Sequence, residues 1–206
     1  MAETEQPQIY LITPGDVELS TFPGVLASVL DAVPVACLRL ALTSNDEDRL
    51  LRAGDALREV AHARDVPIVI DRHWQLAERL GLDGVHLLDG ARQIRAARKV
   101  LGEDAIVGSY CGTSRHDGMS AGEAGADYVG FGPCAPTALG DGSFAEPELF
   151  GWWSEMIEVP VVAEGALTPE LVTALAPLTD FFGMGPEIWE SDDPVAALKT
   201  LAAAIL

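Results

Sequence analysis

Two stretches of sequence decide the fold: Leu82-Asp83-Gly84-Val85-His86-Leu87 and Gly125-Ala126-Asp127-Tyr128-Val129-Gly130-Phe131-Gly132-Pro133. In each, a Gly or Leu and an Asp precede a short run of β-forming residues. The second run leads directly into Gly132-Pro133, a turn signal. This order is typical of a helix end, a short buried parallel strand and the loop that begins the next helix.

The same unit recurs along the whole chain. Strands are predicted at residues 8–12, 35–40, 67–70, 84–87, 106–110, 128–131, 161–163 and 181–184. Amphipathic helical segments are predicted at 23–31, 46–64, 74–80, 91–101, 117–123, 147–156, 168–176 and 192–205. Thr168-Pro169 and Asp193-Pro194 each place a capping side chain before Pro at the first helical position.

Strands that alternate with helices predict a parallel sheet, which can be open or closed. An open, doubly wound sheet usually carries a glycine-rich loop after its first strand, but here Thr13-Pro14-Gly15-Asp16 follows residues 8–12. Eight repeats fit a compact (β/α)8 barrel instead. We therefore expect residues 1–206 to form a single barrel domain.

The charge of the chain is strongly negative. The formal net charge is −19, Lys99 and Lys199 are the only lysines, and Lys199 is the only Lys or Arg after Arg115. Such a surface repels nucleic acid and anionic membranes, so the acidity is interpreted as a solubility feature. The acidic start, residues 1–5, resembles no signal peptide, and no apolar run approaches a membrane span. We expect a cytoplasmic protein.

In a (β/α)8 barrel the reactive groups follow the strand ends and together form the mouth of the barrel. The predicted mouth residues are Arg39, Asp71, His73, His86, Asp89, Ser109, Tyr110, Cys111, Pro133, Thr137, Glu164, Gly165, Gly183 and Gly185.

Several of these residues also have a purely structural interpretation. His86 can be a histidine satisfied within the core, and Asp71 can cap the helix that begins near Trp74. Arg39, in an apolar strand, favours a functional role, because a buried arginine is costly unless it is paired or meets a ligand anion. Cys111 is interpreted as a reduced thiol, with a nucleophilic cysteine as the alternative.

The glycines after the last two strands can hold a phosphate on backbone N–H groups. Barrels commonly bind phosphate in these two loops, where Gly165, Gly183 and Gly185 would permit close approach. Tight turns alone would explain the same glycines. Glu164 argues against a phosphate, since a carboxylate repels it unless protonated or paired.

From about Val35 to the C-terminus, the chain resembles the thiamine phosphate synthase and thiazole tautomerase family. The most specific matching motif is Ala126-Asp127-Tyr128-Val129-Gly130-Phe131-Gly132-Pro133 followed by Pro136-Thr137. Pro67-Ile68-Val69-Ile70-Asp71, the stretch 82–87 and Val161-Val162-Ala163-Glu164-Gly165 also match. The resemblance implies a (β/α)8 barrel that joins a hydroxymethylpyrimidine pyrophosphate to a thiazole phosphate with the help of Mg²⁺. It also implies a homodimer.

Site residues follow from the same resemblance. It implies catalytic roles for Arg39, as the pyrophosphate-binding arginine, and for His86, beside the pyrimidine. Thr137 and Gly165 match positions near the thiazole phosphate. The remaining expected substrate-binding residues are Asp71, His73, Tyr110, Gly183 and Gly185.

Several family positions are substituted in this chain. The two metal-binding aspartates fall at Arg72 and Ala91, the two lysines at Ala41 and Gly140, and the tautomerase histidine at Gly112. Mg²⁺ normally needs one or two carboxylates together with substrate phosphates. We therefore predict no ordered Mg²⁺ at the mouth without ligand, and weak binding with pyrophosphate present.

Two functions follow from this sequence. The first is the family reaction, with Arg39 holding pyrophosphate while His86 and Thr137 orient the substrates. The second is a catalytically silent barrel that binds a thiazole phosphate, thiamine phosphate or another small heteroaromatic ligand. The substitutions at the metal-binding and lysine positions favour the second function. His86, Thr137 and Gly165 are retained and are compatible with both functions.

Overall fold

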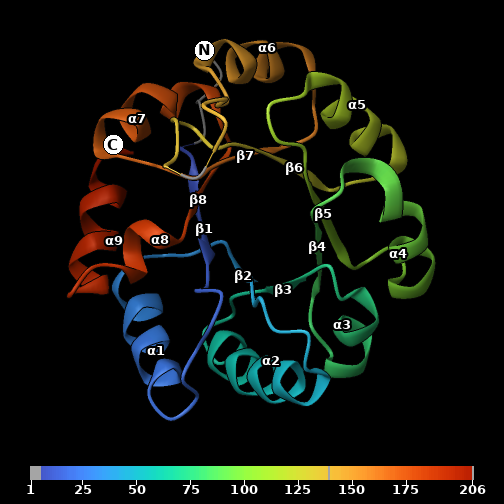
Figure 1. The fold of residues 1–206 in the computed structure, drawn as a ribbon, viewed down its shortest axis with the longest axis vertical. Helices are drawn as coiled ribbons and strands as arrows, with labels where there is room; N and C mark the ends of the chain where they lie inside the picture. The colour runs from blue at the N-terminus through green and yellow to red at the C-terminus, as the bar shows by residue number, and fades with distance from the viewer. Residues whose placement is uncertain (1–5, 139, 206) are drawn as a thin grey trace.

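A computed structural model describes residues 6–138 and 140–205, in which eight parallel strands close into a barrel surrounded by helices (Figure 1). Residues 1–5, on which the expectation about a signal peptide rests, lie outside the described residues. The strands are β1 (Gln8–Ile12), β2 (Cys37–Leu40), β3 (Ile68–Asp71), β4 (Gly84–Leu87), β5 (Ile106–Tyr110), β6 (Tyr128–Phe131), β7 (Val161–Glu164) and β8 (Phe181–Met184).

The strands pair in chain order, and β8 pairs with β1 to close the sheet. The helices are α1 (Phe22–Ala32), α2 (Glu47–His62), α3 (Trp74–Leu80), α4 (Ile94–Leu101), α5 (Arg115–Ala124), α6 (Pro147–Met156), α7 (Pro169–Leu175), α8 (Pro186–Trp189) and α9 (Pro194–Ala203). The 3₁₀ turns η1 (Gly90–Gln93) and η2 (Ala176–Leu178) complete the order. The predicted (β/α)8 barrel is thus confirmed.

The predicted element boundaries change at a few places. The segment predicted as one helix over 91–101 divides into η1 and α4, and the short α8 was not predicted. Asp71 ends β3 rather than following it, and it does not cap α3, whose N-cap residue is His73. The predicted caps of α7 and α9 are confirmed, since Thr168 accepts from the N–H of Leu171 and Asp193 from that of Ala196.

The apolar residues form two separate layers, because successive side chains on a strand point to opposite faces. The larger layer lies between the strands and the helices, and it contains Trp153 and Phe131 with ring centroids 5.0 Å apart. The smaller layer fills the inside of the barrel and includes Tyr10, Val69 and Tyr128. The inside of the barrel is therefore only partly apolar, because it also contains the hydroxyl groups of Tyr10 and Tyr128.

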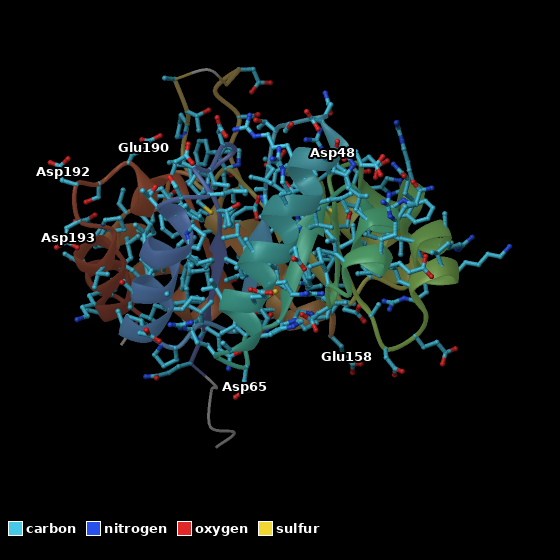
Figure 2. The ribbon with its side chains drawn as sticks, turned by 90° about the horizontal axis from the view of Figure 1, so that it is seen from below. Asp48, Asp65, Glu158, Glu190, Asp192 and Asp193 are labelled. Atoms are coloured by element: carbon cyan, nitrogen blue, oxygen red, sulfur yellow. The ribbon has the colours of Figure 1, made fainter. Side chains whose placement is uncertain are left out.

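The acidic side chains are spread over the outside of the barrel. Figure 2 shows Asp48 and Glu190 toward one end of the molecule and Asp65 and Glu158 toward the other. None of the helices in the described ranges combines the length and the apolar character that a membrane crossing requires.

Candidate functional site

Arg39 is the centre of a buried polar cluster at the carboxyl end of the barrel. It faces inward from β2, as Cys37 does, and it is 7% exposed. Its Nη1 donates to Glu164 Oε2 at 2.7 Å and to His86 Nε2 at 3.0 Å, and its Nη2 donates to Glu164 Oε1 at 3.4 Å. Strands distant in the sequence thus supply one connected network.

Asp71, from β3, is the second carboxylate of this cluster. Its Oδ1 lies 3.2 Å from Arg39 Nε, close enough for an ion pair but without hydrogen-bond geometry. Asp71 is 6% exposed, and burial raises its pKa to about 6, with Arg39 lowering it and Glu164 raising it. Asp71 therefore carries a carboxyl group that can gain or lose a proton near neutral pH.

The charge of Arg39 is secured by its neighbours. Burial lowers the pKa of the guanidinium, but the carboxylates of Glu164 and Asp71 raise that pKa by more than burial lowers it. The net shift of the pKa is therefore upward. One cation facing two carboxylates leaves the cluster negative whenever both carboxylates are ionised. A buried arginine is tolerable in such surroundings because its partners compensate its lost hydration.

His86 continues the network into the barrel. It is fully buried, and burial followed by the charge of Arg39 lowers its pKa well below its usual value. Because Arg39 can only donate, Nε2 of His86 must accept and Nδ1 must carry the proton. Nδ1 then donates to Tyr128 Oη at 2.9 Å, and the hydroxyls of Tyr128 and Tyr10 lie 2.5 Å apart.

Glycines on the neighbouring strands make room for this cluster. A Cβ added to Gly183 would lie 2.7 Å from the Cβ of Glu164, and one added to Gly130 would lie 3.6 Å from its Oε2. Gly165, with φ of 83°, needs the conformational freedom of glycine. Of the glycines that were predicted to hold a phosphate, Gly183 thus also accommodates the side chain of Glu164.

A cavity of about 660 Å³ lies above Arg39, and we call it the mouth cavity. Arg39 is the only Lys or Arg among the described residues that line it. Trp189 contributes an aromatic wall, and its indole N–H donates to the carbonyl of Ile12. The full lining is Ile12, Thr13, Pro14, Gly15, Asp16, Arg39, Ala41, Thr43, Glu164, Gly165, Gly183, Pro186, Trp189 and Glu190.

Other predicted site residues lie apart from the mouth cavity. Tyr110 donates its hydroxyl to the carbonyl of Gly132 at 2.5 Å and lines a separate cavity of about 810 Å³, together with Asp89 and Cys111. Burial raises the pKa of Tyr110 to about 12. Asp89, Tyr110 and Cys111 therefore belong to a different cavity from Arg39.

Four further predicted residues also lie outside the Arg39 network. His73 is half-buried at the start of α3, with its Nε2 unpartnered, and burial lowers its pKa. Thr137 is exposed on the loop between β6 and α6. The N–H of Gly185 donates to Glu187 Oε2 at 3.0 Å, so a carboxylate of the chain occupies the position predicted for a phosphate. Ser109 faces away from the lumen and donates to the carbonyl of Gly90.

Cys111 has the surroundings of a structural thiol. It is 5% exposed and belongs to the apolar layer outside the strands. Burial raises its pKa to about 11. A nucleophilic cysteine needs the opposite shift, so the geometry favours the reduced-thiol interpretation.

The residues present do not fit a Mg²⁺ site built from two protein carboxylates. Asp71 is engaged with Arg39, and Arg72 beside it is a cation. Oδ2 of Asp89 accepts from Gln93, and Ala91 has no ligating side chain. Over residues 6–138 and 140–205, no three His, Cys, Asp or Glu side chains gather as metal ligands would. Weak Mg²⁺ binding stays a prediction.

Two parts of the network were missed by reasoning from the sequence. Tyr10 and Tyr128 were not selected, although both occupy inward positions on predicted strands, where a hydroxyl needs a partner. Glu164 was predicted to face the mouth and to oppose a phosphate, but not to be the partner of Arg39. Alternation along each strand could have indicated that all three side chains point inward.

Comparisons with known proteins agree with the fold and with the motifs. The family model "Thiamine monophosphate synthase" matches residues 9–179. The chain is 42% identical to a thiamine-phosphate synthase of Rhodospirillum centenum over 93% of this chain and 94% of that protein. It is 39% identical to a thiamine-phosphate synthase of Erythrobacter litoralis over 100% of this chain and 99% of that protein.

A solved structure shows the same fold at greater sequence distance. The thiamine phosphate pyrophosphorylase from Pyrococcus furiosus superposes with a TM-score of 0.83 at 22% identity, covering 96% of this chain and 95% of that one. The family model spans most of the chain, and the curated relatives match over nearly their whole lengths. The chain therefore belongs to the thiamine monophosphate synthase family.

Proposed function

We propose that this chain joins a hydroxymethylpyrimidine pyrophosphate to a thiazole phosphate at the mouth of the barrel. The bond between the pyrimidine methylene carbon and the pyrophosphate oxygen breaks, and that oxygen keeps the electron pair. The methylene carbon then bonds to the thiazole nitrogen. The 42% identity to the Rhodospirillum centenum protein over 93% of the chain is the observation that carries this proposal.

The roles that we propose follow from the contacts of each residue. Arg39 lines the mouth cavity and is the cation available to the departing pyrophosphate, whose developing charge must be stabilised. His86 is fully buried behind Arg39, so it acts as a positioning residue through the 3.0 Å contact with Nη1. Gly165 and Gly183 lie where a phosphate can approach the backbone.

The remaining predicted residues are assigned to the two substrates. Thr137 and Gly185 are assigned to the thiazole phosphate, and Asp71, His73 and Tyr110 to the pyrimidine side. The family uses Mg²⁺, but Asp71 and Asp89 are engaged with Arg39 and Gln93 and do not fit a site of two protein carboxylates.

A direct assay tests the reaction. Purified protein is incubated with both substrates and MgCl₂, and the coupled product is measured by mass spectrometry. We expect turnover, and we expect Arg39→Ala to lower it by about 10²–10³-fold, the usual cost of losing one charge-stabilising group. A folded wild-type protein that gives no product at high enzyme concentration would contradict the proposal.

The second candidate function is a barrel that binds such ligands without joining them. The pairing of Arg39 with two carboxylates favours it, since an engaged cation stabilises a departing pyrophosphate less well. Thermal unfolding separates the two functions. A ligand present at a hundred times its Kd stabilises the protein by about 2.7 kcal/mol. Stabilisation by thiamine phosphate without turnover supports the binder, and stabilisation by pyrophosphate with Mg²⁺ supports the enzyme.

We further propose that the chain is one domain that assembles as a homodimer. The adjacent tryptophans do not form an exposed aromatic patch for this purpose. Trp153 is 1% exposed, and half-buried Trp152 is covered by the guanidinium of Arg115, 4.9 Å from the ring centroid. Light scattering decides the question, because a mass near 21.8 kDa at micromolar concentration would exclude the dimer.

A further inference from the structure

The guanidinium of Arg39 has few N–H groups left for a ligand. An arginine carries five N–H donors, one on Nε and two on each Nη nitrogen. Both donors of Nη1 are used, by Glu164 Oε2 at 2.7 Å and by His86 Nε2 at 3.0 Å. One donor of Nη2 reaches Glu164 Oε1 at 3.4 Å, and Nε lies 3.2 Å from Asp71 Oδ1.

The edge formed by Nη1 and Nη2 is therefore occupied by one carboxylate, and a second carboxylate lies beside Nε as an ion pair without a hydrogen bond. Arginine binds carboxylates and phosphates with the same paired N–H geometry. Glu164 spans Nη1 and Nη2, and Asp71 covers the side of Nε. A phosphate that binds the edge formed by Nη1 and Nη2 must displace Glu164, and at the side of Nε it meets Asp71 as a like charge.

The position of Glu164 is built into the barrel. Glu164 is 8% exposed at the end of β7, on a strand three places from β2 around the barrel. Its side chain occupies the space that a side chain at Gly183 would fill, since a Cβ there would lie 2.7 Å from its own Cβ. The contact with Arg39 is thus the packed state of the side chain, not one exposed conformer among many.

We propose that Glu164 is a specificity-determining residue that occupies the anion position of Arg39. The mouth then accepts a phosphate or pyrophosphate group at Arg39 only against competition from the chain's own carboxylate. Neutral and cationic parts of a ligand meet no such competition. This inference rests on the proposed function only for assigning the pyrophosphate to Arg39.

Binding of pyrophosphate alone, without metal, tests the proposal. Sodium pyrophosphate is titrated by calorimetry, in the presence of EDTA, into the wild type, Glu164→Gln and Glu190→Gln. Glu190 lines the same cavity but is exposed, so its substitution removes the same charge from the cavity without freeing Arg39. We expect Glu164→Gln to lower the Kd at least tenfold and Glu190→Gln to change it less than threefold.

A second pair of variants tests whether a gain in pyrophosphate affinity depends on Arg39. Adding Arg39→Met to Glu164→Gln should remove the gain, and Glu164→Ala should reproduce it if the glutamine variant folds poorly. Circular dichroism establishes that each variant is folded. Because the readout is binding, the result is independent of whether the wild type turns over.

Three outcomes would overturn the proposal. The first is a Glu164→Gln protein that binds pyrophosphate no more tightly than the wild type, including the case in which neither binds. The second is an equal gain in Glu190→Gln, which would show a general effect of charge. The third is a gain that persists without Arg39.

Discussion

Removing Arg39 should destabilise the barrel strongly, and the loss should depend on pH. Arg39→Met keeps the length and apolar character of the side chain but leaves Glu164 and Asp71, 8% and 6% exposed, as two buried carboxylates without their cation. It also leaves Nε2 of His86 without its donor. Breaking a buried ion pair from one side typically costs about 3–5 kcal/mol.

That cost is large for a protein of this size. Domains are commonly stable by about 5–15 kcal/mol, so we expect Arg39→Met to lose a substantial part of its free energy of unfolding at pH 8. The loss should shrink at pH 5, because burial raises the pKa of Asp71 to about 6 and its protonation removes one of the two uncompensated charges. Adding Glu164→Gln should restore part of the stability at pH 8, since one of the two buried charges is then absent.

Urea unfolding at pH 5 and pH 8 measures these differences. Arg64→Met is the matched control, because Arg64 pairs with Asp31 at 2.7 Å on the surface, where Asp31 is 61% exposed. Exposed pairs contribute little, so this variant should stay close to the wild type. An Arg39→Met protein that loses no more stability than Arg64→Met, or loses the same amount at both pH values, would refute the reasoning.

Three further predictions concern single side chains. Burial raises the pKa of Asp71 to about 6, above the value of about 4 in an unfolded chain. The protonated side chain therefore contributes stability that is fully present below about pH 4 and is lost as the pH rises through 6. Asp71→Asn should therefore gain stability relative to the wild type between pH 4 and 7, by up to about 3 kcal/mol in urea unfolding, and a relative loss would contradict this. Trp153→Ala should cost about 3–5 kcal/mol, because Trp153 is 1% exposed in the outer layer, and a shift in the urea midpoint equivalent to under about 1 kcal/mol would contradict it. Cys111, with its pKa raised to about 11, should react with iodoacetamide at pH 7.5 about two orders of magnitude more slowly than a free thiol, and equal rates would show an accessible thiolate.

The sequence was sufficient for the barrel because its signals are local and repeated. Stretches such as 82–87 and 125–133 each contain a helix end, a strand and a turn, and eight of them leave little choice of architecture. Caps such as Thr168 depend on neighbours within three residues, so they could be predicted too. The short α8 carries no periodic pattern of its own, and its placement against the barrel was not predictable.

The cluster around Arg39 depends on geometry that no local pattern contains. The sequence indicated that Arg39 and Asp71 face the mouth, but not that Glu164 reaches Arg39 across the lumen. That contact depends on the stagger of strands around a closed barrel and on the space left by Gly183. The hydroxyl pair of Tyr10 and Tyr128 depends on the same closure, because the two residues are far apart in the chain.

The network inside the barrel also makes the chain a convenient subject for nuclear magnetic resonance. The protein has three tyrosines, and all of them belong to the barrel: Tyr10 and Tyr128 in the lumen, and Tyr110 at its carboxyl end. Labelling tyrosine with ¹³C at Cζ would give a spectrum of three ring signals with no surface background. Two of those rings are connected through His86 to Arg39. A ligand that displaces Glu164 would thus be detected from inside the barrel, by atoms that it never touches.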